Sequence, residues 1–266
     1  MIQIKNKVVV ITGASQGIGK HLALEFARRG AITIICARSV KRLKEVELTA
    51  KHENGNVFSV VLDVTSEISV RSTVNKVIKK YGRIDVLVNN AGVGLFETIA
   101  KSKREDIKKV FDTNFFGPLS LMQFVLPHMR KRKQGMIVNI SSAISKYSLF
   151  HQGIYAASKA ALERITESAD IEENRFGIKT LLVIPDRTRT HFRKHIVGPK
   201  KLARLPFKLP ESDPQKVAKK IVDSIVKERC VVHTSLRSRA YHIAASLWPR
   251  YVGAMLKNSY KAHRKD

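Results

Sequence analysis

The chain has 266 residues, of which 44% are hydrophobic and 27% are charged, and its formal net charge at neutral pH is +27. The apolar content is enough for one large core and excludes disorder as the main state. The two cysteines are far apart and form no C-x-x-C motif or Cys/His cluster, which argues against a disulfide-rich secreted domain and against a zinc module. The N-terminal apolar run is too short for a signal peptide. Together these features predict a reducing, cytoplasmic setting.

Short runs rich in β-branched residues alternate along the chain with segments of helical periodicity. The expected strands are 8–12, 32–36, 57–63, 84–88, 136–141 and 179–184. The expected helices are 18–29, 41–51, 68–81, 105–129 and 155–176. Continuous apolar strands separated by such helices are typical of βαβ units, whose parallel sheet is covered on both faces. The sequence therefore predicts an α/β fold, a single Rossmann-type doubly wound parallel sheet flanked by helices.

Residues 110–129 contain one formal charge, Asp112, and are long enough to cross a bilayer. Asn114, Gly117, Pro118 and Pro127 lie within the stretch, and polar groups are costly in lipid. We therefore expect a buried helix at a subunit contact rather than a membrane span.

A glycine-rich turn follows the first strand, where residues 12–19 read Thr-Gly-Ala-Ser-Gln-Gly-Ile-Gly and open a helix. Glycines permit a positive φ and a close approach of the backbone to a pyrophosphate, and the helix N-terminus offers N–H groups to it. An ordinary loop is the alternative, but the position between strand and helix favours a dinucleotide site. The expected contacts are Gly13, Ser15, Gln16, Gly17, Ile18 and Gly19.

The end of the second strand indicates which dinucleotide is bound. A carboxylate there would hold the adenosine ribose 2′-hydroxyl and repel a 2′-phosphate. The chain instead has Arg38 and Ser39, which predict NADP(H) rather than NAD(H), although a solvated loop arginine is the alternative. Asp63, followed by Val64, ends the third expected strand and is placed to accept from the adenine amino group or to cap a helix.

Tyr155 and Lys159 lie four residues apart on one expected helical face. A free tyrosine has a pKa of about 10, and a neighbouring cation would lower it toward the range of a proton relay. Ser142, at the end of the fifth strand, would hold the same substrate oxygen. Surface Tyr/Lys pairs at this spacing are common, so the pair alone is weak evidence.

Together these motifs make residues 5–235 resemble a short-chain dehydrogenase/reductase. The resemblance depends on the glycine turn, Asn89-Asn90-Ala91-Gly92, Asn114, Ser142 and the Tyr155/Lys159 pair, which occur in the family's order. It implies a sheet of about seven strands, hydride transfer between a nicotinamide cofactor and an alcohol or carbonyl, and a homodimer or homotetramer. No metal is implied.

The resemblance also implies the role of each residue. Tyr155 would be the general acid in reduction, Lys159 would lower its pKa and bind the nicotinamide ribose, and Ser142, or else Ser141, would orient the substrate oxygen. Asn114 would hold a water that links Lys159 to solvent. Asn90, Ala91 and Gly92 would contact the adenosine side of the cofactor.

One departure from the family pattern follows the sixth strand. Relatives usually have Pro-Gly and then a threonine that contacts the nicotinamide amide. Here Pro185 is followed by Asp186, and Thr188 and Thr190 are the threonines in reach. We expect cofactor contacts from Pro185, Thr188 and Thr190, with Asp186 tilting the nicotinamide or restricting the backbone.

The last third of the chain carries more than half of the excess positive charge. We expect a catalytic domain over 1–235, with a basic substrate lid at about 188–210, and a basic amphipathic extension over 236–266 that Pro249 kinks. Its arginines, Trp248 and Tyr251 predict peripheral contact with an anionic membrane, with packing on the enzyme's own core or a second subunit as the alternative.

These features predict an NADP(H)-dependent oxidoreductase that acts on a carbonyl or alcohol of an apolar, lipid-like substrate, a role in lipid metabolism. One alternative is a steroid- or retinoid-type alcohol dehydrogenase of the same fold. Another is a non-catalytic nucleotide-binding protein with an anionic polymer partner. Nucleic acid is disfavoured because the sequence has no helix-turn-helix, RNP or zinc-finger pattern.

Overall fold

The computed structural model describes residues 2–53, 55–199 and 210–262. In it, seven parallel strands form one sheet in the order β3-β2-β1-β4-β5-β6-β7. The strands are β1 (Val8–Thr12), β2 (Ile32–Ala37), β3 (Val57–Val61), β4 (Val86–Asn89), β5 (Gly135–Ile140), β6 (Ile178–Ile184) and β7 (Val231–His233). The chain order reverses between β1 and β4, which is the switch point where such sheets bind ligands. The predicted fold class is confirmed.

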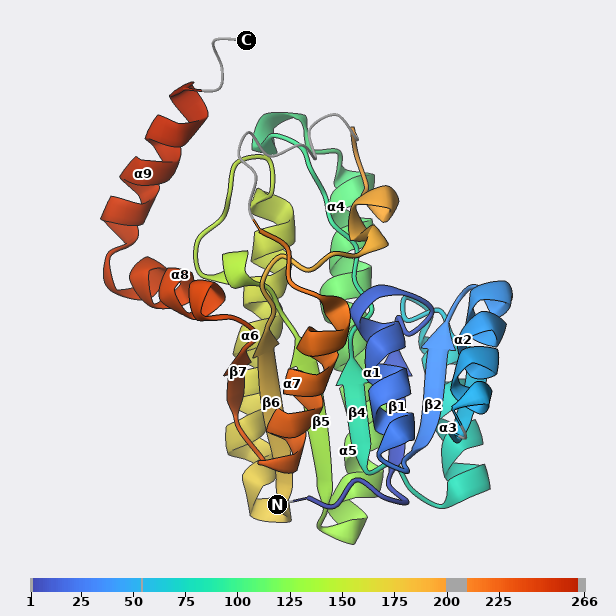
Figure 1. Ribbon diagram of the computed structural model, residues 1–266. Helices are drawn as coiled ribbons and strands as arrows, with labels where there is room; N and C mark the ends of the chain where they lie inside the picture. Colours follow the sequence, from blue (N-terminus) through green and yellow to red (C-terminus); the bar gives the residue numbers. More distant parts are fainter. Residues whose placement is uncertain (1, 54, 200–209, 263–266) are drawn as a thin grey trace.

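Helices cover both faces of the sheet (Figure 1). The helices packed against one another on one face are α1 (Gly17–Arg28), α2 (Val40–His52) and α7 (Pro214–Val226). Those on the other are α3 (Glu67–Tyr81), α4 (Arg104–Phe111), α5 (Gly117–Arg132) and α6 (Gly153–Glu173). The short 3₁₀ segments are η1 (Ile99–Lys101), η3 (Ala143–Ser145), η4 (Asn174–Phe176) and η5 (His191–His195).

The strands alternate their side chains between two separate apolar cores. Val9 and Ile11 of β1 belong to the core beneath α1 and α7, whereas Val8 and Val10 belong to the core beneath α3 and α5. All four are at most 2% exposed. A strand buried on both faces reads as a continuous apolar run, which is why the sequence pattern located the strands.

The single helix expected over 105–129 is divided in the structure. A π-helical turn, η2 (Asp112–Phe116), separates α4 from α5 and contains the fully buried Asn114. Apolar spacing does not distinguish an extra residue per turn, so this turn could not be predicted from the sequence. π-turns are frequent at functional sites.

Two further helices, α8 (Leu236–Leu247) and α9 (Pro249–Ala262), follow β7, and α9 projects beyond the sheet and its helices (Figure 1). Pro249 is the first residue of α9, so it divides this segment as expected. A Cβ on Gly253 would lie 2.2 Å from the Tyr147 hydroxyl oxygen, and the Tyr260 ring lies 5.0 Å from the Phe150 ring. Helix α9 is therefore packed against the segment between η3 and α6.

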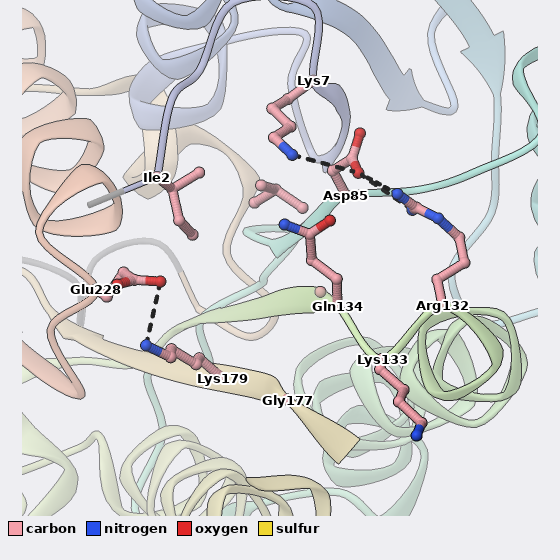
Figure 2. A pocket seen from close by; sticks show the side chains of 11 residues that line it. Ile2, Lys7, Asp85, Arg132, Lys133, Gln134, Gly177, Lys179 and Glu228 are labelled. Atoms are coloured by element: carbon pink, nitrogen blue, oxygen red, sulfur yellow. Dashed lines mark hydrogen bonds and ion pairs between the residues drawn. The ribbon is translucent and has the colours of Figure 1, made fainter.

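A smaller pocket lies at the amino end of the strands (Figure 2). Asp85 is 4% exposed there, accepts from the Val8 amide at 2.8 Å, and pairs with Arg132 at 3.1 Å and with Lys7 at 4.0 Å. Lys179 pairs with Glu228 at 3.1 Å. The Asp85 contacts join the starts of β1 and β4 to the end of α5, and the Lys179 pair joins β6 to the turn after α7. In the described part of the chain, no helix is both long and apolar enough to cross a membrane.

Candidate active site

A cavity of about 800 Å³ lies along the carboxyl ends of strands β1 to β6. It brings together predicted residues that are far apart in the sequence. They are Gly13, Ser15, Gln16, Gly17, Ile18, Arg38, Ser39, Asp63, Val64, Asn90, Ala91, Gly92, Ser142, Tyr155, Lys159, Pro185, Thr188 and Thr190. Gly19 and Asn114 do not line the cavity, but they contact Asn90 and Val93, respectively, which do. The order of the strands is what makes these residues neighbours.

The glycine-rich turn packs tightly against the end of β4. Gly13 has a φ of 63°, and a Cβ on it would lie 2.7 Å from the Ala91 Cα. A Cβ on Gly19 would lie 2.5 Å from Asn90 Nδ2, which itself donates to the Thr12 carbonyl at 2.9 Å. Side chains at these glycines would push the turn out of place, so the glycines serve backbone packing as well as an approaching ligand.

The N-terminus of α1 faces this cavity with the features of an anion site. The side chain of its N-cap residue, Gln16, makes no capping hydrogen bond and accepts instead from Arg42 Nη1 at 3.1 Å. Backbone N–H groups at a helix N-terminus that lack a side-chain cap favour a phosphate. Gly17, with a φ of 57°, opens the helix.

The end of β2 supplies cations rather than a carboxylate. Arg38 and Ser39 line the cavity as expected, and Arg42, one turn further on, lines it too. Arg42 was not predicted from the sequence, although its spacing of four residues from Arg38 was the available signal. Asp63 is not a helix cap, because its carboxylate accepts from the amide of Thr65 at 3.0 Å and Ser66 caps α3.

Tyr155 lies in the first turn of α6, within hydrogen-bonding reach of Ser142. Burial raises the pKa of Tyr155 to about 12, and the hydrogen bond with Ser142 opposes this rise. Lys159 is not among the groups that lower this pKa here, so the expected effect of its charge on the phenol stays a prediction. The ring packs 5.7 Å from the Phe192 ring, and the Lys159 ammonium donates elsewhere.

Lys159 is 4% exposed, and its Nζ donates to the Ile140 carbonyl at 2.8 Å. Burial lowers the pKa of Lys159 to about 8, while the Glu163 carboxylate acts in the opposite direction. A Cβ on Gly92 would lie 3.5 Å from this Nζ, so the glycine leaves room for the side chain. The ammonium therefore sits at the floor of the cavity between β4 and β5.

Asn114 hydrogen-bonds to the backbone that follows Gly92 and to the residue that precedes Lys159. Its Oδ1 accepts from the Val93 amide at 2.9 Å, and its Nδ2 donates to the Val93 carbonyl at 2.9 Å and to Ser158 Oγ at 3.0 Å. The π-turn η2 presents the amide to all three groups. Asn114 thus fixes the backbone after Gly92, and its expected role toward a water stays a prediction.

Asp186 does not restrict the backbone, because it is not among the residues with a positive φ. Its carboxylate accepts from the Arg187 amide at 2.7 Å, from Ser235 Oγ at 2.8 Å, and from Arg237. Ser235 is the N-cap of α8. The residue that departs from the family pattern therefore ties the end of β6 to the start of α8.

The expected lid is described in part. One β-bridge joins Val197 to Leu95 and another joins Thr188 to Ser212, whereas residues 200–209 lie outside the described residues. Beyond Tyr155 the cavity has an apolar wall that was not predicted from the sequence. It consists of Phe96, Ile144, Leu149, Phe192, Tyr241, Met255 and Leu256. Three of these residues come from α8 and α9.

The residues present fit a nicotinamide dinucleotide. One end of the cavity has a glycine turn with no room for side chains and a row of cations, and the other has a hydroxyl pair and a buried ammonium. The volume of about 800 Å³ is in the range of small-molecule sites. Within the described ranges, no group of three or more His, Cys, Asp or Glu residues is placed to hold a metal ion.

Comparison with known proteins agrees with this geometry. The family model described as short chain dehydrogenase matches residues 7–200. The chain is 38% identical over 187 residues to a 3-ketodihydrosphingosine reductase of Bacteroides thetaiotaomicron, covering 70% of this chain but 65% of that protein. It is 33% identical to dehydrogenase/reductase SDR family member 7B of Danio rerio, over 99% of this chain and 89% of the relative.

The solved structures show the same architecture. A short-chain dehydrogenase/reductase of Burkholderia phymatum in complex with NAD aligns with a TM-score of 0.85 at 24% identity, covering 96% of this chain and 97% of its own. Other solved structures of this fold contain NADP or NADPH. The expected non-catalytic alternative is therefore set aside, and the chain belongs to the short-chain dehydrogenase/reductase family of oxidoreductases, which act on CH–OH or C=O groups with NAD(P).

Proposed function

We propose that this enzyme uses NADPH to reduce the carbonyl group of an apolar, lipid-like molecule. The observation that carries the proposal is that one cavity is lined by the glycine turn, by Tyr155, Ser142 and Lys159, and by seven apolar or aromatic residues. A carbonyl carbon at this junction would face both the cofactor site and a proton donor. The alcohol product would leave through the apolar end.

NADPH, when bound, supplies the hydride. Ser142 donates a hydrogen bond to the substrate oxygen and orients it. Tyr155, whose pKa is about 12, remains protonated at neutral pH and gives its proton to the more basic alkoxide oxygen. The Lys159 ammonium then stabilises the phenolate.

Cofactor contacts follow from the lining. Ser15, Gln16, Ile18 and the α1 N-terminus would hold the pyrophosphate, and Asp63 and Val64 would flank the adenine. Asn90, Ala91 and Gly92 would border the adenosine side of the cofactor, while Pro185, Thr188 and Thr190 would border the nicotinamide. Arg38 and Ser39, with Arg42 beside them, would bind the 2′-phosphate, which supports NADPH over NADH.

The Arg38→Asp variant tests this preference. A carboxylate repels a 2′-phosphate and accepts from a 2′-hydroxyl, so the ratio of kcat/KM for NADPH to that for NADH should fall about 100-fold or more. Steady-state kinetics with both cofactors measure the ratio. Lys44→Asp makes the same charge change on α2, but Lys44 does not line the cavity and pairs with Glu47, so its ratio should stay within about threefold of wild type. An unchanged ratio in Arg38→Asp would refute the assignment.

The substrate class is supported by the wall and by one relative. Seven apolar or aromatic residues line the cavity, and the Bacteroides relative is named a 3-ketodihydrosphingosine reductase. The test is NADPH oxidation by the full chain with long-chain ketones and aldehydes, steroid ketones and short ketones. Turnover confined to short ketones, or absent with all of them, would reject the proposal.

Helices α8 and α9 support peripheral contact with an anionic membrane. Leu247, Trp248 and Tyr251 are each more than 60% exposed, and no acidic residue lies between 229 and 265. Met255 is 49% exposed and also lines the cavity, so the apolar surface continues to the substrate site. Basic helices with exposed aromatic residues bind anionic interfaces. Two unpaired cysteines support a cytoplasmic setting.

Flotation with vesicles tests this contact. Wild type should float with vesicles that contain phosphatidylserine and much less with pure phosphatidylcholine. In the Trp248→Glu/Tyr251→Glu variant the vesicle-bound fraction should fall at least about tenfold, because two carboxylates replace aromatic rings that would insert into the membrane interface. The matched control, Leu48→Glu/Ile68→Glu, adds the same charge at exposed positions on α2 and α3 and should still float. Flotation of both variants alike would refute the assigned surface.

We also propose a homodimer or homotetramer built through α4, α5 and α6, as the family pattern implies. Phe116, 54% exposed, and Ile171, 81% exposed, support this surface. The domain division at residue 235 belongs to the same proposal, with α8 and α9 as an extension that also walls the cavity.

A further inference from the structure

Glu163 is a buried carboxylate one helical turn beyond Lys159 on α6. Its side chain is 1% exposed. Its Oε1 accepts from Ser141 Oγ at 2.9 Å and from Ser145 Oγ. Buried carboxylates are costly and rare unless their lone pairs are satisfied. Nothing in the proposed chemistry yet uses this one.

The hydrogen bonds of Glu163 reach both catalytic segments. Ser141 directly precedes Ser142 at the end of β5, and its Oγ also lies 3.4 Å from the Lys159 carbonyl oxygen. Ser145 ends η3, which starts just after Ser142. One carboxylate therefore joins the segment that carries Ser142 to the helix that carries Lys159 and Tyr155.

Several charged and titratable groups surround this carboxylate. His242 Nε2 of α8 lies 3.8 Å from Oε1, and Lys146 Nζ and Arg164 Nη2 lie 3.8 and 3.9 Å from Oε2. The His233 ring of β7 lies 5.0 Å from the His242 ring, and Arg239 and Lys220 act on His233. The Lys159 ammonium is the charged group that acts on this carboxylate from the direction of the cavity.

These neighbours keep Glu163 ionised. Burial raises the pKa of Glu163, but His242, Ser145 and Ser141 together hold it below its ordinary value. The resulting negative charge acts on the buried Lys159 ammonium and opposes the lowering of its pKa by burial. Helix α8 covers the carboxylate with His242, whose side chain is only 12% exposed, and keeps water from screening it.

We propose that Glu163 is a positioning residue for Lys159, which holds the catalytic ammonium in its charged form and joins it to the Ser142 segment. The inference goes with the proposed function, because Lys159 matters for carbonyl reduction. It assigns a role to a residue that touches neither substrate nor cofactor.

A titration of Lys159 tests the inference without substrate or cofactor. The full chain, labelled with lysine carrying ¹³C at Cε, is titrated by NMR, and the resonance missing in Lys159→Arg identifies Lys159. Wild type should titrate near pH 8. In Glu163→Gln, which keeps the hydrogen-bond acceptor but removes the charge, the midpoint should fall by about one pH unit. Glu163→Asp restores the charge and should return the midpoint most of the way.

Glu167→Gln is the matched control. Glu167 lies one turn further along α6, is 48% exposed and pairs with Arg164. Loss of the Glu167 charge should leave the titration midpoint of Lys159 within about 0.2 pH unit of the wild-type value. An unchanged midpoint in Glu163→Gln, or an equal shift in Glu167→Gln, would overturn the inference.

Kinetics then connect this titration to catalysis. The reduction rate of wild type should fall at high pH, when Lys159 loses its proton. In Glu163→Gln this fall should occur at a lower pH, displaced by the same amount as the NMR midpoint. Failure of the wild type to oxidise NADPH would reject the proposed function alone. An unshifted NMR midpoint would reject the positioning role alone.

Discussion

The Tyr155→Phe variant should reduce carbonyl substrates at least about 1,000-fold more slowly than wild type, with little change in KM. General acid catalysis by a positioned side chain contributes rates of this order. Phenylalanine keeps the ring that packs 5.7 Å from Phe192, so the variant removes the hydroxyl and little else. The measurement is kcat for NADPH oxidation with the best substrate of the carbonyl panel.

Tyr241→Phe is the matched control for this loss. Tyr241 also lines the cavity, and burial also raises its pKa to about 12. Its hydroxyl, however, donates to the Tyr147 carbonyl at 2.8 Å, away from Ser142. Tyr241→Phe should lose less than about tenfold, the effect of one neutral hydrogen bond. If Tyr241→Phe were the more damaging variant, Tyr155 would not be the acid.

The second large effect concerns Lys159. Lys159→Met should lower kcat by about 100-fold or more, because the phenolate of Tyr155 loses its cation. In wild type the reduction rate should fall as pH rises through about 8, where Lys159 loses its proton. The variant has no such group, so its residual rate should not change in this range. A pH–rate profile of both proteins checks the claim, and a wild-type rate that is level from pH 7 to 9 would contradict it.

Lys159 should also affect stability, and in the opposite direction from activity. Its pKa is about 8 in the folded chain and 10.5 in the ordinary state, so between these values the unfolded chain binds the proton that the folded chain has released. The free energy of unfolding therefore rises with pH over this window. Lys159→Met should lack this rise, which denaturant titrations at pH 7.5 and 9.5 would measure.

The sheet could be predicted from sequence because its central strands are buried on both faces. The strand over 8–12 is an apolar run that ends at Thr12, and the strand over 136–141 is apolar except for the buried Asn139 and Ser141. The structure places both within one residue of the expected bounds. β7 and α7 had no range assigned. β7 has only three residues and ends in a histidine, which gives no distinct run.

The site was predicted to the extent that it follows strand ends and helix starts. Tyr155, Lys159 and Ser142 meet because α6 and β5 are adjacent, which the βαβ pattern implies. The Glu163–His242 approach was out of reach, since it joins α6 to a helix 79 positions along the chain. The pKa of Tyr155 was also out of reach, because it depends on how deeply the ring is buried and not on the spacing to Lys159.

The carboxylate of Asp186 has a consequence for protein engineering. Its partners Ser235 and Arg237 lie at the start of α8, and its side chain is only 9% exposed. A truncation before residue 235 would leave this charge at the domain surface without its ligands and would also remove the wall formed by Tyr241, Met255 and Leu256. Shortened versions should therefore carry Asp186→Gly, and chimeras with relatives should exchange residue 186 together with the C-terminal helices.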